Sequence, residues 1–233
     1  MQRYFSKELY DNKFSLSKDD LYHIKTVMRM NPNDLVEVVY ENNLYICHLD
    51  DSYDAIIDKK IEGERNKKVY CTLCLPLLTE QKFSFVLQKA TELGIDEIIP
   101  VITERSIVNL KDKEDKKLNR WNRICKEAAE QSKRLDIPKI SEVKKISELN
   151  LEGLKIVCST KEKSKSIKNV LQNTTNCDRM VIMVGPEGGI SNNEEEKLIS
   201  LGFIPVTLGS NIMRVETVPI FMLSVLNYEM MEW

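Results

Sequence analysis

The sequence predicts an α/β protein in which a small, mostly β part precedes a larger part of alternating strands and helices. Apolar and polar residues alternate over 35–40 and 44–49, as in the two strands of a hairpin. From residue 69 onward, short apolar runs alternate with segments of helical periodicity, which is typical of βαβ units. Five of the eight glycines lie between residues 185 and 209, where predicted strands end. Strand ends of this kind hold ligands in α/β proteins.

Residues 1–66 are expected to form the small β part. Ser17, which acidic residues follow, predicts the N-cap of a short helix. A turn of Glu and Asn residues joins the two hairpin strands, and a further strand is expected over 53–60. Residues 58–68 are polar and charged, so we interpret them as a linker between two domains.

Residues 69–233 are expected to form the larger α/β part. A buried strand over 69–77 precedes a helix with apolar residues at i, i+3, i+4, i+7 and i+10, and Gly94 is expected to cap that helix. The next strand covers 95–102, so the three elements form a βαβ unit with parallel strands. The alternation continues with a helix over 116–134, strands over 154–160, 180–185 and 203–209, and a helix over 218–231.

Composition argues against a membrane span and a secretory signal. No run of about 18 apolar residues occurs. The N-terminal segment MQRYFSKELYDNKF lacks the apolar centre of a signal peptide, so we expect a cytoplasmic protein. Cys71 and Cys74 have the spacing of a metal-binding pair, but residues three apart on a strand point to opposite faces. We therefore expect buried, reduced thiols and no metal site.

The charge of the chain is balanced overall but not locally. The net charge of −2 does not indicate a nucleic-acid partner. Residues 111–139, however, carry ten Lys and Arg residues against six acidic ones. This basic segment is either a patch that faces phosphate groups or the solvated face of a helix, and charge alone favours the second interpretation.

The glycine loop Gly185–Gly189 follows a strand and precedes a predicted helix start. Ser191 and Glu194 have the spacing of a capping box. The loop is neither a dinucleotide fingerprint nor a phosphate-binding P-loop, because it lacks their glycine and lysine patterns. Pro186 also removes one backbone donor, so the loop suits a less anionic ligand such as an adenosine. A tight connection without a ligand explains this loop equally well.

A second loop, over residues 208–217, favours the ligand-binding interpretation. Thr217 is a predicted N-cap, and Pro219 fits the first turn of the helix that follows. Arg214 and Glu216 beside this cap are unusual for a simple connection. Two such loops at the carboxyl ends of neighbouring strands would enclose a crevice.

Several motifs together resemble one protein family. The segments HIKTVMRM (23–30), KATELGIDEIIPVITERS (89–106), EAAEQSKR (127–134), GPEGGIS (185–191) and LGSNIMRVET (208–217) occur in this order. They are similar to the bacterial 16S ribosomal RNA uridine-N3 methyltransferases of the SPOUT superfamily. The resemblance extends over nearly the whole chain, and five ordered motifs are far more specific than any one of them.

The resemblance implies a PUA-like β-barrel for RNA binding over 1–66 and a SPOUT methyltransferase domain over 69–233 with a C-terminal trefoil knot. It implies S-adenosyl-L-methionine as cofactor, 16S ribosomal RNA of the small subunit as partner, and a homodimer. The predicted helix over 218–231 is apolar around much of its surface, which fits a dimer interface or a packed knot.

The resemblance also implies roles for individual residues. The cofactor would contact Ser159, Thr160, Val184, Gly185, Pro186, Glu187, Gly188, Leu208, Gly209, Ile212, Met213, Arg214 and Thr217. The catalytic candidates near the methyl acceptor are Arg105, Arg214 and Glu92. RNA contacts are expected from His23, Arg29, Arg120, Arg123, Lys133 and Arg134.

The expected reaction is methyl transfer to N3 of one uridine. The N3–H group is a weak acid, so either a base removes its proton or cations stabilise the anion. Arg105 and Arg214 suit the second role, although each would also suit a structural pair with Glu187 or Glu216. The family usually has Pro-Arg where this chain has Ser210-Asn211, which leaves one contact in question. The alternative function is a non-catalytic RNA-binding factor of ribosome assembly with the same fold.

Overall fold

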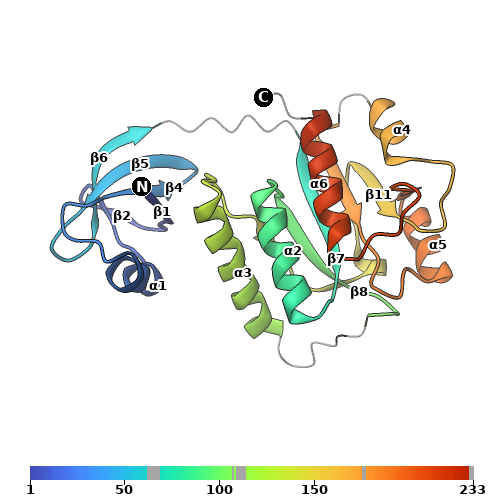
Figure 1. Cartoon of the computed structure of the whole chain (residues 1–233), viewed down its shortest axis with the longest axis horizontal. Helices are drawn as coiled ribbons and strands as arrows, with labels where there is room; N and C mark the ends of the chain where they lie inside the picture. The colour runs from blue at the N-terminus through green and yellow to red at the C-terminus, as the bar shows by residue number, and fades with distance from the viewer. Residues whose placement is uncertain (62–68, 107, 109–113, 175–176, 231–233) are drawn as a thin grey trace. The chain divides into compact units, whose positions relative to one another are not determined.

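The computed structural model describes residues 1–61, 69–106, 108, 114–174 and 177–230. The chain divides into two compact units (Figure 1). The first unit comprises Met1–Arg65 and Lys126–Ile137, and the second comprises Asn66–Cys125 and Pro138–Trp233. The alternation of strands and helices does not indicate that residues 126–137 group with the N-terminal part. The linker predicted over 58–68 begins too early, because residues 58–61 belong to a strand, and its residues 62–68 lie outside the described residues.

The first unit contains a sheet with the strand order β1-β4-β5-β6-β3-β2. Its strands are β1 (Gln2–Phe5), β2 (Leu9–Tyr10), β3 (Lys13–Phe14), β4 (Leu35–Tyr40), β5 (Asn43–Leu49) and β6 (Ala55–Ile61). The predicted hairpin is confirmed as β4 and β5, which pair in antiparallel fashion. Its turn places Glu41 and Asn42 at positive φ, a conformation that asparagine tolerates well. β1 was not predicted, and it pairs in parallel with β4.

The predicted N-terminal helix has two parts of different geometry. α1 (Lys18–Tyr22) begins at Ser17, whose side chain accepts a hydrogen bond from the backbone N–H of Asp20, so the predicted cap is confirmed. The chain continues as the π-helix η1 (His23–Met28) and ends at Arg29, which has a φ of 54°. The backbone N–H of Arg29 donates to the carbonyl of Ile24, five residues back, which accounts for the wide turn.

The second unit contains a parallel sheet with the order β10-β8-β7-β12-β11-β13, and β9 pairs with β8. The predicted α/β class with a parallel sheet is confirmed. The strands are β7 (Tyr70–Pro76), β8 (Glu97–Ile102), β9 (Lys139–Ile140), β10 (Lys144–Lys145), β11 (Leu154–Cys158), β12 (Arg179–Met183) and β13 (Ile204–Val206). The helices are α2 (Glu80–Glu92), α3 (Glu114–Gln131), η2 (Ile146–Glu148), α4 (Ile167–Gln172), α5 (Asn192–Ser200) and α6 (Thr217–Met230).

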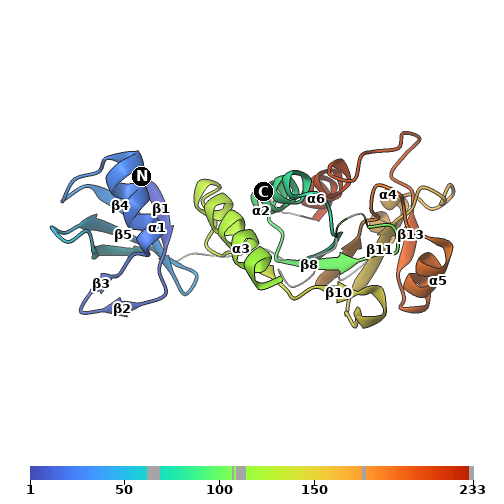
Figure 2. The ribbon, with the colours of Figure 1, turned by 90° about the horizontal axis from the view of Figure 1, so that it is seen from below.

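Two apolar clusters lie on opposite faces of this sheet. One includes buried residues of α2, α4 and α6 and the first part of α3, and there the rings of Phe83 and Trp121 stack with centroids 4.3 Å apart. The other includes η2 and α5. Figure 2 shows α2 and α6 side by side over one face of the sheet. Cys71 belongs to the first cluster and Cys74 to the second, which confirms that the two thiols point apart.

The parallel sheet gathers the loops that matter for function. All its strands run in one direction, so the segments after β11, β12 and β13 begin at the same edge, here called the carboxyl edge. β11 lies between β12 and β13, which corrects the expectation that the two glycine-containing loops follow neighbouring strands. Among the described residues, no helix is long and apolar enough to cross a membrane, and no cluster of His, Cys, Asp and Glu suits a metal ion.

Candidate functional site

A pocket of about 480 Å³ lies at the carboxyl edge of the second unit. Three segments form most of its wall: residues 158–161 after β11, 184–190 after β12, and 212–216 with Val218 after β13. Lys82 at the start of α2 and Glu195 in α5 complete it. The intervening strand β11 therefore contributes a third loop between the two loops that sequence spacing identified.

The glycine loop has a backbone conformation and a close contact that favour glycine. The N–H of Gly189 donates to the carbonyl of Pro186 at 2.8 Å, and Gly189 has a φ of 71°. A side chain at Gly185 would place its Cβ 2.9 Å from Cγ1 of Ile190, closer than real Cβ contacts. At Gly185 the wall of the pocket is therefore formed by backbone atoms alone.

The loop after β11 is held against the start of α5. The predicted capping box is confirmed, because Ser191 Oγ accepts from the N–H of Glu194 and the Glu194 carboxylate accepts from the N–H of Ser191. Lys161 Nζ donates to Asn192 Oδ1 at 2.8 Å and to Glu195 Oε2 at 2.7 Å. Ser159 Oγ also donates to Glu195. These contacts fix the wall between the first and second loops.

The opposite part of the pocket carries a second set of charges. Lys82 Nζ lies 2.9 Å from Glu187 Oε1 and 3.8 Å from Glu216 Oε2. Burial alone would raise the pKa of Glu187, but the hydrogen bond from Lys82 holds that pKa below its ordinary value. The same hydrogen bond raises the pKa of Lys82. The Oε2 atom of Glu216 is buried and has no hydrogen-bond partner among the described residues.

Sequence reasoning missed Lys82, although a signal for it exists. α2 follows β7, so the first turn of α2 begins at the carboxyl edge, beside the loops of the neighbouring strands. A charged residue in the first turn after a parallel strand was therefore a candidate. Other lining residues that had no predicted cofactor contact are Cys158, Lys161, Gly189, Ile190, Glu195, Val215, Glu216 and Val218.

Most of the expected cofactor residues lie on the wall of the pocket. They are Ser159, Thr160, Val184, Gly185, Pro186, Glu187, Gly188, Ile212, Met213 and Arg214. Leu208, Gly209 and Thr217 are not among the lining residues. α6 begins at Thr217, so Thr217 is its first helical residue and not the predicted N-cap, which would precede it. Pro219 lies in the first turn of α6, as predicted.

The three catalytic candidates occupy different places. Arg214 lines the pocket. Arg105 packs against the glycine loop, and its guanidinium donates to the carbonyl of Gly188 at 2.8 Å. Glu92 pairs with Lys89 near the carboxyl terminus of α2, just before the chain enters β8. Because α2 leads from the carboxyl edge back to the amino edge of the sheet, the structure separates Glu92 from the pocket.

Two RNA-contact candidates of the first unit differ in accessibility. His23 Nδ1 lies 3.0 Å from the hydroxyl of Tyr4, and the two rings meet edge to face. Arg29 is exposed at the end of η1. His23 therefore has a structural partner, whereas the Arg29 side chain is open to solvent.

The candidates of the basic segment also differ in accessibility. Arg120 pairs with Glu80 at 2.9 Å, yet its side chain is 60% exposed, and Arg123 is exposed. Lys133 Nζ lies 3.0 Å from Glu37 Oε2. Arg134 pairs with Asp136, and its side chain is only 10% exposed. Lys111 and Lys113 of this segment lie outside the described residues.

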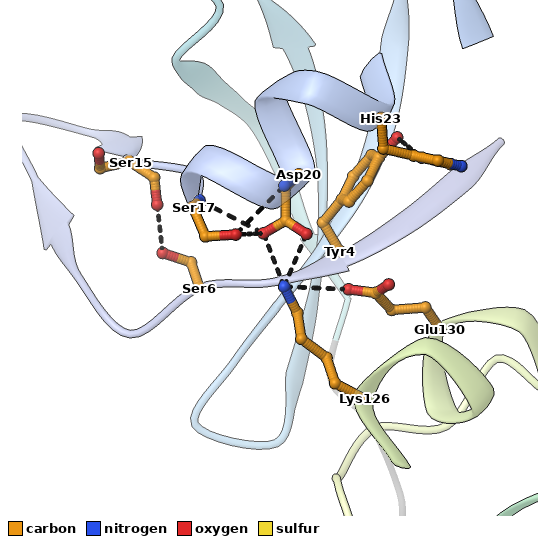
Figure 3. Close-up of polar contacts among 8 residues, drawn as sticks. All are labelled: Tyr4, Ser6, Ser15, Ser17, Asp20, His23, Lys126 and Glu130. Atoms are coloured by element: carbon orange, nitrogen blue, oxygen red, sulfur yellow. Dashed lines mark hydrogen bonds and ion pairs between the residues drawn. The ribbon is translucent and has the colours of Figure 1, made fainter. Parts of the chain in front are cut away.

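A largely buried group of polar and charged residues, here called the Lys126 cluster, shows the role of one lysine of the basic segment. It comprises Tyr4, Asp20, Lys126 and Glu130 in the first unit (Figure 3). Lys126 Nζ contacts the two carboxylate oxygens of Asp20 at 2.6 and 2.7 Å and lies 3.5 Å from Glu130 Oε1. Burial raises the pKa of Glu130 to about 7, although Lys126 acts in the opposite direction. Lys126 therefore serves the packing of the first unit.

Comparisons with known proteins identify the family. A family model described as an RNA methyltransferase domain matches residues 65–227. A ribosomal RNA small subunit methyltransferase E from Mesomycoplasma hyopneumoniae is 36% identical over 96% of this chain and 98% of its own length. Its namesake from Bacillus subtilis is 33% identical over 98% of this chain and 97% of its own.

A solved structure supports the same assignment at the level of the fold. The ribosomal RNA small subunit methyltransferase E from Neisseria gonorrhoeae, crystallised with S-adenosylmethionine, is 28% identical. It matches with a TM-score of 0.85 over 98% of this chain and 97% of its own. The loops that surround the pocket thus belong to a member of the RNA methyltransferase family, in the group of ribosomal RNA small subunit methyltransferase E proteins.

Proposed function

We propose that this protein transfers a methyl group from S-adenosyl-L-methionine to N3 of one uridine in 16S ribosomal RNA of the small ribosomal subunit. The observation that carries the proposal is the three-loop pocket at the carboxyl edge, in a chain that belongs to an RNA methyltransferase family. A related enzyme of this group was crystallised with the same cofactor, and its name specifies ribosomal RNA of the small subunit.

The residues around the pocket suit this cofactor. Gly185 leaves space where a Cβ would meet Ile190, and the segment around Met213 offers apolar surface. The Oε2 atom of Glu216, which has no hydrogen-bond partner among the described residues, could interact with a hydrogen-bond donor or a positive charge of the ligand. We infer that the loops after β11, β12 and β13 hold the cofactor, which supplies an electrophilic methyl group when bound. The volume of about 480 Å³ lies in the range of small-molecule sites.

Arg105 and Arg214 are proposed to act on the acceptor base. The uridine N3–H must lose its proton before or during methyl transfer, and nearby guanidinium groups favour the anion. Arg214 lines the pocket, and Arg105 is held beside it through the carbonyl of Gly188. The protein then contributes mainly alignment of donor and acceptor together with this electrostatic stabilisation. Glu92 is left out of the proposal because of its place on α2.

We also propose the trefoil knot of the SPOUT superfamily in the second unit. β13 pairs on the far side of β11, yet the chain then returns to form α6, which packs against α2. The connecting residues 207–216 pass the loop after β11, where Thr207 N–H donates to the carbonyl of Lys165 and Ile167 N–H donates to the carbonyl of Thr207. A chain that crosses back beside another loop in this way suits a knot.

The first unit is proposed to be a PUA-like barrel that binds RNA in the cytoplasm. Its six-stranded sheet and apolar core support a compact β module. Among the expected RNA contacts, Arg29 is open to solvent there, and Arg120 and Arg123 of α3 are exposed in the second unit. A homodimer through α6 is supported by Ile220, Phe221 and Val225, which remain only partly buried in one chain.

Mass spectrometry of 16S ribosomal RNA tests the reaction. The gene is deleted, and the strain is complemented with wild type, Arg105→Gln or Arg179→Gln. The last variant is the matched control, because Arg179 is exposed at the amino end of β12. N3-methyluridine should disappear on deletion, return with wild type and the control, and fall strongly with Arg105→Gln. A modification that persists in the deletion strain would support the alternative, a non-catalytic factor of ribosome assembly.

A further inference from the structure

The pocket wall carries three positive and three negative side chains, and the carboxylates differ in the hydrogen bonds that they accept. The cations are Lys82, Lys161 and Arg214, and the carboxylates are Glu187, Glu195 and Glu216. Glu195 accepts hydrogen bonds from both Lys161 and Ser159, and Glu187 accepts one from Lys82 at 2.9 Å. Glu216 has no hydrogen bond to its buried Oε2 atom among the described residues.

Glu216 is therefore the carboxylate with the least compensation. Its side chain is 18% exposed, and the ammonium group of Lys82 lies 3.8 Å away while donating to Glu187 instead. A largely buried carboxylate is unfavourable unless it gains a hydrogen bond or a nearby positive charge. Since Glu216 lines the pocket, a cationic ligand bound there would add a positive charge close to this carboxylate.

We propose that Glu216 makes the pocket selective for a positively charged sulfonium ligand over the neutral thioether of the same shape, and that Lys82 limits this preference. The inference rests on the proposed function, in which the cofactor carries one more positive charge than its demethylated product. Methyl transfer forms a bond from uridine N3 to the methyl carbon and breaks the bond from sulfur to that carbon. The electrons of the broken bond remain on sulfur, and the N3 proton passes to solvent. The ligand thereby loses the charge that Glu216 attracts, which favours release of the product.

The two residues should act in opposite directions. Removing the charge of Glu216 weakens the binding of the cation and leaves the neutral ligand almost unaffected. Removing the charge of Lys82 leaves Glu187 and Glu216 uncompensated, so the cation should bind relatively more tightly. One charge–charge interaction over a few ångströms in a partly solvated site changes affinity by about tenfold. If both residues had a purely structural role, each substitution would instead lower the affinity for both ligands.

Titration calorimetry with S-adenosylmethionine and S-adenosylhomocysteine tests this proposal on the full chain. The measured quantity is the ratio of the two dissociation constants for wild type, Glu216→Gln and Lys82→Met. Glu196→Gln is the matched control, because it removes the same charge from an exposed position of α5 outside the pocket wall. We expect Glu216→Gln to reduce the preference for the sulfonium about tenfold, Lys82→Met to increase it, and the control to leave it unchanged.

The outcomes separate the two proposals. Circular dichroism establishes that each variant is folded, and if Glu216→Gln does not fold, the increase expected for Lys82→Met alone decides the question. An unchanged ratio in Glu216→Gln, or a reduced ratio in Lys82→Met, would overturn the selectivity while leaving the cofactor assignment intact. Failure of the wild type to bind either ligand would instead overturn the proposed function.

Discussion

Two carboxylates in this molecule look alike in isolation and differ in their surroundings. Glu216 and Glu130 each have a buried oxygen without a hydrogen-bond partner among the described residues, and each lies near a lysine, at 3.8 and 3.5 Å. Glu216 lines a pocket of about 480 Å³, whereas Glu130 packs within the Lys126 cluster. A buried carboxylate oxygen without a hydrogen bond therefore indicates a ligand only where the fold also leaves room for one.

The largest expected effect concerns the Lys126 cluster. Asp20→Ala leaves the ammonium group of Lys126 without its main partner, although that side chain is 23% exposed. We expect the free energy of unfolding to fall by about 2 to 4 kcal/mol, measured by urea denaturation. The affinity of the folded molecules for S-adenosylmethionine should not change, because Asp20 belongs to the first unit.

The control for this variant is Ser17→Ala. It removes the two hydrogen bonds of Ser17 Oγ, with the backbone N–H and the carboxylate of Asp20, and keeps the contact between Asp20 and Lys126. Loss of an N-cap costs about 1 kcal/mol. Equal destabilisation by the two variants would mean that helix capping, not the ion pair, accounts for the effect of Asp20.

A smaller effect, of opposite sign, is expected for Glu130→Gln. The folded protein raises the pKa of Glu130 to about 7 from 4.5, so it binds an additional proton between these pH values. The free energy of unfolding of the wild type therefore falls as the pH rises through this window. The variant should be more stable than wild type by about 1 to 3 kcal/mol at pH 8 and similar to it near pH 4.5. A stabilisation that is the same at both pH values would contradict this account.

Apart from the capping control, the smallest expected change in stability concerns the pocket. Gly185→Ala places a methyl group against Ile190, at 2.9 Å from Cγ1 before any relaxation. Overpacking of this kind costs about 1 to 2 kcal/mol, and the displaced Ile190 should weaken cofactor binding. Calorimetry and urea denaturation measure the two effects. The double variant with Ile190→Ala should recover part of both, and simple additivity of the two substitutions would rule out the contact as their cause.

Much of this fold was predictable because its signals are local. The hairpin β4–β5, the unit from β7 to β8 and the capping box at Ser191 all follow from residues close together in the sequence. β1 was missed because its four residues, QRYF, show no alternation of apolar and polar side chains. The two-residue strands β9 and β10 are too short to show a periodicity.

The candidate site was predictable in its loops and less so in its charges. The glycines and Arg214 mark the loops by their residue types alone. The approach of Lys82 to Glu216 depends on strand order, which brings residues 134 positions apart to one edge of the sheet. Glu92 lies in a motif of the family, but the direction of α2 carries it to the other end of the helix. Sequence motifs can identify candidate site residues, but the strand order and the helix directions determine which of these residues lie close together.

The first unit is discontinuous in the sequence, and this has a consequence for synthesis on the ribosome. Asp20 is translated 106 residues before Lys126, its partner in the folded protein. At a translation rate of about 5 to 20 residues per second, Lys126 is synthesised roughly 5 to 20 s after Asp20. Complete folding of the N-terminal module is thus delayed until β7, α2 and β8 of the second unit have been synthesised, so the speed of translation sets how long this module remains incomplete.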